Sequence, residues 1–164
     1  MKELTQVRDA VIAALQAAGL TAVTAFPAER AKSYPKAMAA VSVGTAAGRT
    51  VDFCNYLGEA LDPETGTIRE LYGKQLEGEV LVDVRADRAV ECEAGCETAA
   101  EVLLGGLPSG IRSGELSWEA LSWEKETGMF LRRGRLRCRA VFVARQAEEG
   151  ETFLDFILKG VMTD

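Results

Sequence analysis

The residues whose side chains could most readily bind a metal or act as nucleophiles are four cysteines: Cys54, Cys92, Cys96 and Cys138. Thiolates can hold zinc, and because the chain has no histidine, a zinc site would have to use all four. The alternative is reduced thiols packed in the core, the default for a chain kept in the cytoplasm. The missing histidine also removes the base of a cysteine–histidine nucleophile and the commonest general acid–base group. We therefore predict no metal site and no cofactor.

Two glutamates, Glu119 and Glu124, could form an acid–base pair if folding placed them in a shared pocket. The alternative is a solvated strand face, which their sequence context favours because no recognisable catalytic motif surrounds them. The segment 44–48, GTAAG, lacks the lysine of a phosphate-binding loop, so we interpret it as a turn between strands. The sequence thus predicts a protein that is not an enzyme.

A run of arginines gives the most informative pattern in the chain. Residues 131–145 read LRRGRLRCRAVFVAR, and Arg135, Arg137 and Arg139 alternate with apolar residues. Successive side chains of a strand lie on opposite faces, so this pattern predicts a strand with one arginine face and one apolar face. Six of the nineteen basic residues lie in this stretch, with no acid among them. The candidate interface residues here are Arg132, Arg133, Arg135, Arg137 and Arg139.

These arginines could bind nucleic-acid phosphates or acidic groups on a protein partner. The chain carries a net charge of −6 and has neither a basic helix nor an RNA-binding aromatic motif, which disfavours nucleic acid. Arginine is also enriched at protein interfaces. We therefore expect a protein partner and no specific nucleic acid, with a small nucleic-acid-binding protein using strand 132–145 as the alternative.

Two helices are expected to support this strand. Residues 3–18 have an apolar stripe typical of an amphipathic helix, and Gly19 is a stop signal. Residues 91–105 form the second helix, with an apolar stripe that contains Cys92 and Cys96. Its other face carries three acids at i,i+4 spacing, which we interpret as a solvated ridge: Glu93, Glu97 and Glu101.

The remaining segments predict strands and turns. Strands are expected at 21–26, 37–43, 50–57, 71–76, 79–85 and 116–124, and an acidic loop that could reach a neighbouring subunit at 58–68. Thr127-Gly128 predicts a turn that joins the strand at 116–124 to the arginine strand in a long hairpin. Trp118 and Trp123 differ by an odd number, so one should face the core and the other the outside.

The chain finishes with an apolar segment, TFLDFILKGVMTD. We expect it either to pack as a last strand or to act as a docking tail, because large exposed apolar patches generally mark interfaces. Its candidate interface residues are Phe153, Phe156, Ile157 and Val161. In the docking interpretation residues 146–164 form the interface, and deleting residues 153–164 should abolish assembly.

Together these elements predict a single α+β domain over residues 1–164, in which a mixed, mainly antiparallel sheet is covered by two helices and ends in a long C-terminal hairpin. The longest apolar runs are far shorter than the roughly 20 residues of a membrane helix. The opening MKELTQVRDAV mixes charges with apolar residues, unlike a signal peptide. We expect no membrane partner and a protein made and kept in the cytoplasm.

Several of these segments together resemble tail-terminator (tail-completion) proteins of tailed bacteriophages and prophages. The segments are ELTQVRDAVIAAL, YPKAMAAVSVG, CETAAEVLLGGL, the hairpin LSWEALSWEKETGMFLRRGRLRCRAVFVA and the ending FLDFILKGVM. The resemblance spans nearly the whole chain. It rests on the order of the elements, the size of the chain and the general character of these segments, and there is no signature motif whose residues could be transferred.

The resemblance implies a mixed sheet flanked by helices and a structural protein of the virion tail, assembled in the host bacterial cytoplasm. Such proteins form a homohexameric ring that caps the head-proximal end of the tail tube, stops its growth and joins the head. The implied partners are further copies of the chain, the tail tube protein and a head-completion or neck protein. The closest alternative is another tail or baseplate component of a prophage or phage-tail-like bacteriocin.

Overall fold

The computed structural model describes residues 2–27, 36–50, 56–61, 63–64, 66, 68–146 and 154–160. Within these residues the chain forms two helices and eight strands. The elements are α1 (Lys2–Ala17), β1 (Thr21–Val23), β2 (Met38–Thr50), β3 (Tyr56–Leu61), β4 (Ile68–Ala86), α2 (Ala89–Gly105), β5 (Ile111–Trp118), β6 (Ser122–Glu124), β7 (Met129–Gln146) and β8 (Leu154–Leu158).

Two long antiparallel strands, β4 and β7, form the spine of the sheet, paired from Gly73↔Val143 to Ala86↔Phe130. The other edge of β4 pairs with β2, and the first residues of β4 pair with β3. The other edge of β7 is lined by β6, β5 and β8 end to end. Only β1, which pairs with β2, is parallel to its neighbour among the described strands. The sheet is therefore mixed and mainly antiparallel, as predicted.

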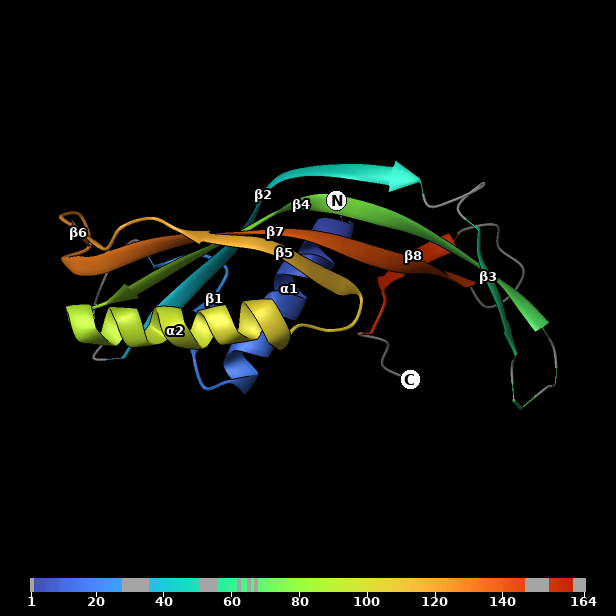
Figure 1. The fold of residues 1–164 in the computed structure, drawn as a ribbon, viewed down its shortest axis with the longest axis horizontal. Helices are drawn as coiled ribbons and strands as arrows, with labels where there is room; N and C mark the ends of the chain where they lie inside the picture. The colour runs from blue at the N-terminus through green and yellow to red at the C-terminus, as the bar shows by residue number, and fades with distance from the viewer. Residues whose placement is uncertain are drawn as a thin grey trace.

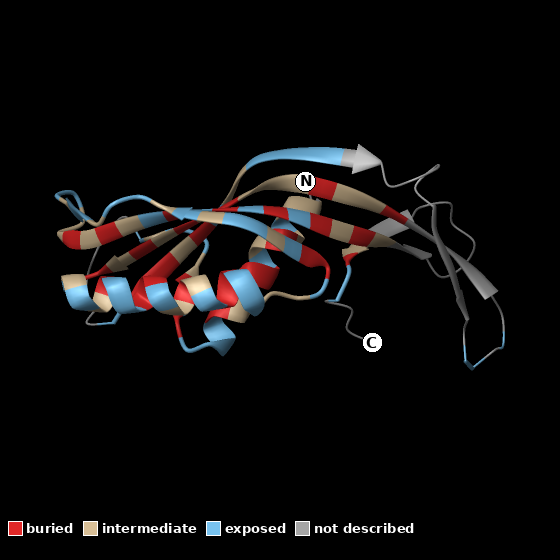
Figure 2. Cartoon of the chain, in the orientation of Figure 1, coloured by how far each residue is buried: buried red, intermediate tan, exposed pale blue. Residues whose placement is uncertain are grey.

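Both helices lie on the same face of the sheet (Figure 1). Their buried faces point toward the strands (Figure 2), where Val11 and Leu15 of α1 and Cys92 and Leu103 of α2 are nearly or fully buried. The apolar faces of β4 and β7 complete this core, because Val80, Val82, Val84, Leu136, Ala140 and Phe142 are all buried in it. The prediction of an α+β fold with two helices over a sheet is confirmed.

Helix α2 approaches the sheet at a glycine. A Cβ built on Gly95 would lie 2.3 Å from the Cβ of Ala37, which precedes β2, and 3.1 Å from Cγ1 of Val84 in β4. A glycine inside a helix ordinarily costs about 1 kcal/mol relative to alanine. Here it allows the helix backbone to come close to the chain entering the sheet.

The predicted turn at 44–48 is wrong, because this segment continues β2. The register shifts between Val43 and Ala46, and the irregularity lies opposite Gly78 of β4. A Cβ at Gly78 would come within 2.8 Å of the Thr45 carbonyl oxygen, so the glycine makes room for the bulged strand. Small residues and glycines mark both turns and bulges, and only the partner strand distinguishes them here.

Three other expectations need correction or completion. The predicted loop at 58–68 is wrong in part, because β3 reaches Leu61 and β4 begins at Ile68. The predicted strands at 71–76 and 79–85 are one continuous strand, β4. The strand expected at 116–124 is interrupted at 119–121, although the hairpin to β7 and its turn at 125–128 are confirmed. The predicted strand at 50–57 lies largely outside the described residues.

Candidate functional site: the open face of the sheet

The face of the sheet opposite the helices, here called the open face, carries the arginines of β7. Along this strand Arg135, Arg137 and Arg139 are exposed, and the residues between them, Leu136 and Cys138, are buried. The predicted alternation is therefore confirmed. It arises because the helices seal one face of β7, while neither helix covers the other face within the described part of the chain (Figure 1).

Carboxylates of β4 lie beside these arginines on the open face. Glu77 carries the shortest contact, 3.1 Å between its Oε1 and Nε of Arg139. Glu79 lies between two arginines, with Oε2 3.6 Å from Nε of Arg135 and Oε1 3.9 Å from Nε of Arg137. The arginine side chains keep 56–71% of their surface exposed, so each pair contributes about 0–1 kcal/mol. These contacts order the arginines without removing them from the surface.

The open face has an excess of positive charge. Arg112 of β5 lies directly opposite Arg139 in the register, and Arg133 lies 4.0 Å from Oδ2 of Asp83. Apart from an ion pair at one end, Arg85–Glu124, the face thus carries five arginines and three carboxylates, Glu77, Glu79 and Asp83, although the whole chain has a net charge of −6. Two like charges directly opposite one another are unfavourable in a sheet. An anionic group placed over Arg112 and Arg139 would relieve that repulsion.

A groove of about 650 Å³ lies over this part of the sheet. Its floor includes Glu77, Glu79, Arg137 and Arg139, and its two sides are formed by residues 45–47 of β2 and residues 112–114 of β5. The groove thus spans four neighbouring strands, β2, β4, β7 and β5, whose backbones cover about 14 Å at a strand spacing of about 4.8 Å. A surface of this span offers a helix or a strand of another protein contacts with more than one strand.

Arg132 does not share the open face with the other arginines. It pairs in register with the buried Val84, which places it on the helix side of the sheet. Its Nε donates a hydrogen bond to the Glu119 carbonyl oxygen at 2.9 Å, and its guanidinium lies 5.9 Å from the ring centroid of Trp118. Because strand side chains alternate, the predicted set Arg132–Arg139 divides between two faces.

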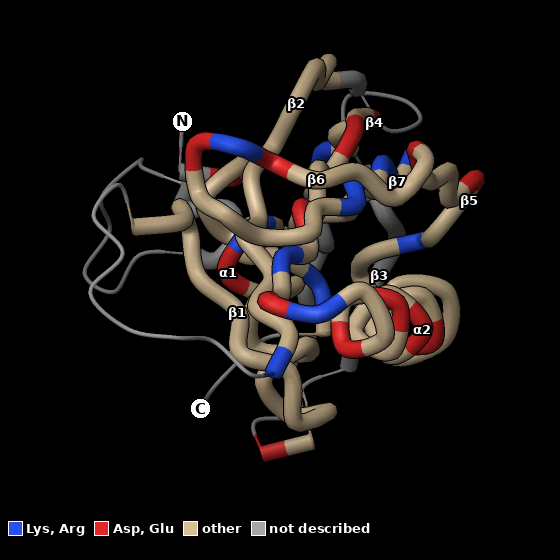
Figure 3. Tube along the Cα trace, turned by 90° about the vertical axis from the view of Figure 1, so that its left-hand side faces the viewer, with Lys and Arg blue, Asp and Glu red and all other residues tan. Residues whose placement is uncertain are grey.

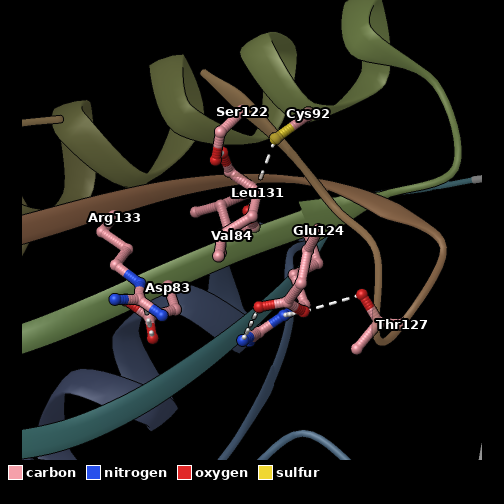
Figure 4. Close-up of polar contacts among 9 residues, drawn as sticks. Asp83, Val84, Cys92, Ser122, Glu124, Thr127, Leu131 and Arg133 are labelled. Carbon is pink, nitrogen blue, oxygen red and sulfur yellow. Dashed lines mark hydrogen bonds and ion pairs between the residues drawn. The ribbon is translucent and has the colours of Figure 1, made fainter. Parts of the chain in front are cut away.

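An ion pair closes one end of the open face. Nε of Arg85 in β4 donates to Oε1 of Glu124 in β6 at 3.0 Å, and the Thr127 hydroxyl donates to the same oxygen at 2.7 Å (Figure 4). The hydrogen bond from Arg85 holds the pKa of Glu124 below its ordinary range. Asp83, also drawn in Figure 4, behaves differently, because desolvation by burial raises its pKa despite the nearby Arg133.

The groups considered for chemistry are separated or buried. Glu124 is engaged by Arg85 and Thr127, whereas Glu119 is exposed, so the two glutamates form no shared pocket. Burial raises the pKa of the Cys138 thiol to about 11. The pKa of Cys96 is raised mainly by its hydrogen bond with Cys92 and further by burial. Cys54 lies outside the described residues, and the described residues contain no cluster of three metal-binding side chains.

The two tryptophans occupy different environments. Trp118 is partly buried and packs against the core, whereas Trp123 is 57% exposed, with its ring edge-on to Phe130 at 4.9 Å between centroids. The predicted division between core and outside is confirmed. The odd spacing of the two tryptophans is not its cause, because the chain leaves the strand between them: β5 ends at Trp118 and β6 begins at Ser122.

The apolar C-terminal segment forms β8, which pairs with β7 from Phe142↔Leu158 to Gln146↔Leu154. Leu158 is buried in the main core, and its backbone N–H donates to Oε1 of Gln6 in α1 at 2.8 Å. Of the two expectations for this segment, the last strand is confirmed for residues 154–158. Ile157 is half-buried and Phe156 is placed in the strand, while Phe153 and Val161 lie outside the described residues.

Two features of the surface were missed from the sequence. Arg112 is the single basic residue of β5, so no local pattern marks it. Only the pairing of β5 with β7 brings it beside Arg139. Val90 and Leu104 are 70% and 56% exposed on α2, at either end of its acidic ridge. The helical period of 3.6 residues per turn places Val90 and Leu104 on the face of Glu93, Glu97 and Glu101, and this could have been seen from the sequence.

Comparison of the chain with protein-family models finds no match, and no curated protein matches it significantly. Among the described residues, neither helix has the length and apolar character needed to cross a membrane.

Proposed function

We propose that this chain is a structural subunit of a phage tail or phage-tail-like particle, in which a homohexameric ring caps the head-proximal end of the tail tube. The observation that carries the proposal is the open face: a grooved, arginine-rich surface on a sheet whose other face is sealed by α1 and α2. The sequence segments that resemble tail-terminator proteins support the same interpretation, as does an α+β fold of the class that the resemblance implies.

A binding role agrees better with the open face than a catalytic one. Its exposed arginines and carboxylates are paired with one another across β4 and β7. The thiols of Cys92, Cys96 and Cys138 are buried, and the two candidate acid–base glutamates lie apart. Fold alone does not fix function, so the proposal depends on this surface and not on the architecture.

The alternative of nucleic-acid binding is less consistent with the same surface. The arginines of the open face outnumber its carboxylates by only two, and the whole chain carries a net charge of −6. A nucleic acid presents a long row of phosphates and gains affinity from many uncompensated cations. A protein partner needs only a few opposite charges and adds apolar contact area, so this surface suits a protein better.

A terminator ring must bind the last tube ring on one side and offer no site for another tube subunit on the other. The proposed partners are therefore other copies of the chain, the tail tube protein and a head-completion or neck protein. The deletion of residues 153–164 is a poor test of assembly, because it removes β8 and with it Leu158 of the core. Loss of assembly would then follow from unfolding.

The direct test is to mix the purified protein with intact tail tubes from its own genomic neighbourhood and to image them by electron microscopy. We expect density at one tube end and a tube length that no longer increases when tube protein is added. A variant with Arg137→Glu should cap less, whereas Lys125→Glu in the exposed β6–β7 turn should cap normally. Absence of the protein from intact tube ends would reject the terminator function, and salt-sensitive binding to DNA in its place would favour the nucleic-acid alternative.

A further inference from the structure

The open face has a counterpart on the opposite side of the same chain. Helix α2 contains four acids and no basic residue (Figure 3). Three of the acids, Glu93, Glu97 and Glu101, are exposed. With 3.6 residues per turn, these three residues fall within an arc of about 80° together with Val90 and Leu104. We call these five residues the α2 stripe: Val90, Glu93, Glu97, Glu101 and Leu104.

The composition of the α2 stripe is unusual for a solvated helix face. Like charges four residues apart repel and weaken a helix. Val90 and Leu104, 70% and 56% exposed, are two of the three large hydrophobic side chains that the described surface exposes. An acidic centre between two apolar ends matches a binding surface, which needs apolar contact area as well as charge.

The spacing of charges on the α2 stripe matches that of the arginines on the open face. Glu93 and Glu101 are eight residues apart on a helix, which is about 12 Å. Arg135 and Arg139 are four residues apart on a strand, which is about 13 Å. Three acids and three arginines can therefore meet one to one along their length. A helix about 10 Å in diameter is also narrower than the four strands under the groove, whose backbones together cover about 14 Å.

Within one chain the two surfaces cannot meet. Helix α2 packs on the sheet face that contains Val84 and Leu136, and the arginines lie on the other side of the same strands. We propose that the open face of one copy binds the α2 stripe of a second copy. The contact is head-to-tail, so every copy keeps one free surface of each kind until the chain of contacts closes on itself.

This inference deepens the proposed function, because it names the contact between neighbouring subunits, and it rests on that function only for closure into a ring. Each charge pair at such an interface stays partly solvated and contributes modestly. Association should accordingly weaken as salt is raised, and steering by opposite charges should speed the encounter. The Glu77 and Glu79 contacts hold the arginine side chains in an ordered row before the partner arrives.

The test uses two full-length variants with reversed charge. The helix variant carries Glu93→Lys, Glu97→Lys and Glu101→Lys, and the face variant carries Arg135→Glu, Arg137→Glu and Arg139→Glu. Alone, each should lose self-association by roughly tenfold or more, because three attractive pairs become repulsive. Mixed in equal amounts they should associate again, since each variant then offers the surface that the other needs. Light scattering after size-exclusion chromatography measures this over a range of protein concentration.

Two controls keep the outcome decisive. Glu126→Lys with Lys125→Glu swaps charges in the exposed β6–β7 turn, outside both surfaces, and should leave association unchanged. If the triple face variant is unfolded by circular dichroism, Arg137→Glu alone replaces it, because this side chain is 71% exposed and its ion pair is long. Reversed variants that associate like the parent, or a mixture of folded variants that stays monomeric where the parent associates, would overturn the proposal.

If self-association is too weak for light scattering to measure, crosslinking tests the same contact. In a background with Cys54→Ser, copies carrying Glu97→Cys are mixed with copies carrying Arg137→Cys, both at high concentration and on tail tubes. The Cα atoms of a Glu–Arg pair lie farther apart than the roughly 7 Å limit of a direct disulfide, so a bifunctional maleimide reagent joins the two thiols through thioether bonds. A mixed crosslinked dimer should form well above the level seen when Glu126→Cys replaces Glu97→Cys. A yield no higher than this control in both conditions would refute the contact. A specific crosslink without any tube capping would support the contact and reject the terminator function, so the two proposals fail separately.

Discussion

Replacement of Gly95 by alanine tests the packing that sets α2 against the sheet. In an ordinary helix interior this change stabilises by about 1 kcal/mol, because alanine has the higher helix propensity. Here the new methyl group would lie 2.3 Å from the Cβ of Ala37 and 3.1 Å from Cγ1 of Val84. Two carbon atoms pack best at about 3.5–4.0 Å, so the helix must move outward by more than about 1 Å.

The expected change in the free energy of unfolding combines the gain in helix propensity with the cost of overpacking. Overpacking a close-packed region typically costs about 1–3 kcal/mol. The Ala37 methyl group is attached directly to the backbone and cannot rotate away, which places the cost in the upper part of that range. After the gain in helix propensity is subtracted, we expect Gly95→Ala to lower the free energy of unfolding by about 1–2 kcal/mol.

Urea unfolding at neutral pH, followed by circular dichroism, measures this change. The midpoint should fall while the slope stays the same, because the surface exposed on unfolding hardly changes. Ala37→Gly removes the group that collides with the new methyl, so the double variant should recover about half or more of the loss. This coupling is expected only for residues in contact.

A matched control lies in the same helix. Gly105, at the end of α2, has no atom within 4 Å of a built Cβ, so Gly105→Ala should be neutral or slightly stabilising. If Gly95→Ala were also neutral or stabilising, or if Ala37→Gly failed to rescue it, the close approach of α2 to the sheet would be refuted.

Two further predictions concern the hairpin. Glu124→Gln should cost about 2 kcal/mol at pH 7, because it leaves Arg85 without its charged partner. Since the pKa of Glu124 is lowered in the folded state, its contribution is complete at neutral pH and is lost as the pH falls through and below about 4.3; urea midpoints of variant and parent should therefore converge in acid, and a constant difference would contradict this. Trp118→Ala should destabilise by about 2 kcal/mol and Trp123→Ala by less than about 1 kcal/mol, and equal losses in thermal unfolding would contradict their different burial.

Local patterns predicted the elements whose signal lies within one segment. The arginine strand, the stop at Gly19 and the turn at 125–128 all follow from side-chain period or turn chemistry, and all are present. The segment 44–48 was misinterpreted because its small residues fit a turn as well as an extended strand. The bulge opposite Gly78 depends on β4, which is distant in sequence.

The candidate surface could be predicted only in part, for the same reason. Arg135, Arg137 and Arg139 share a face by simple alternation, which the sequence shows. Arg132 was grouped with them by composition, although the pleat puts it on the other side. Arg112 and Glu77 join the surface through pairings between strands, and no local pattern reports which strands will be neighbours.

The hydrogen bond from Leu158 to Gln6 joins residues 152 positions apart and has a consequence for biosynthesis. Helix α1 leaves the ribosome early, but the strand that packs beside it is translated long after. Until β8 emerges, the end of β7 has no partner on that edge, and the nascent chain presents an unpaired strand to other nascent chains. Pairings this distant along the chain form slowly. We therefore expect the yield of native protein in cells to depend on the rate of synthesis and on chaperones more than its final stability would suggest.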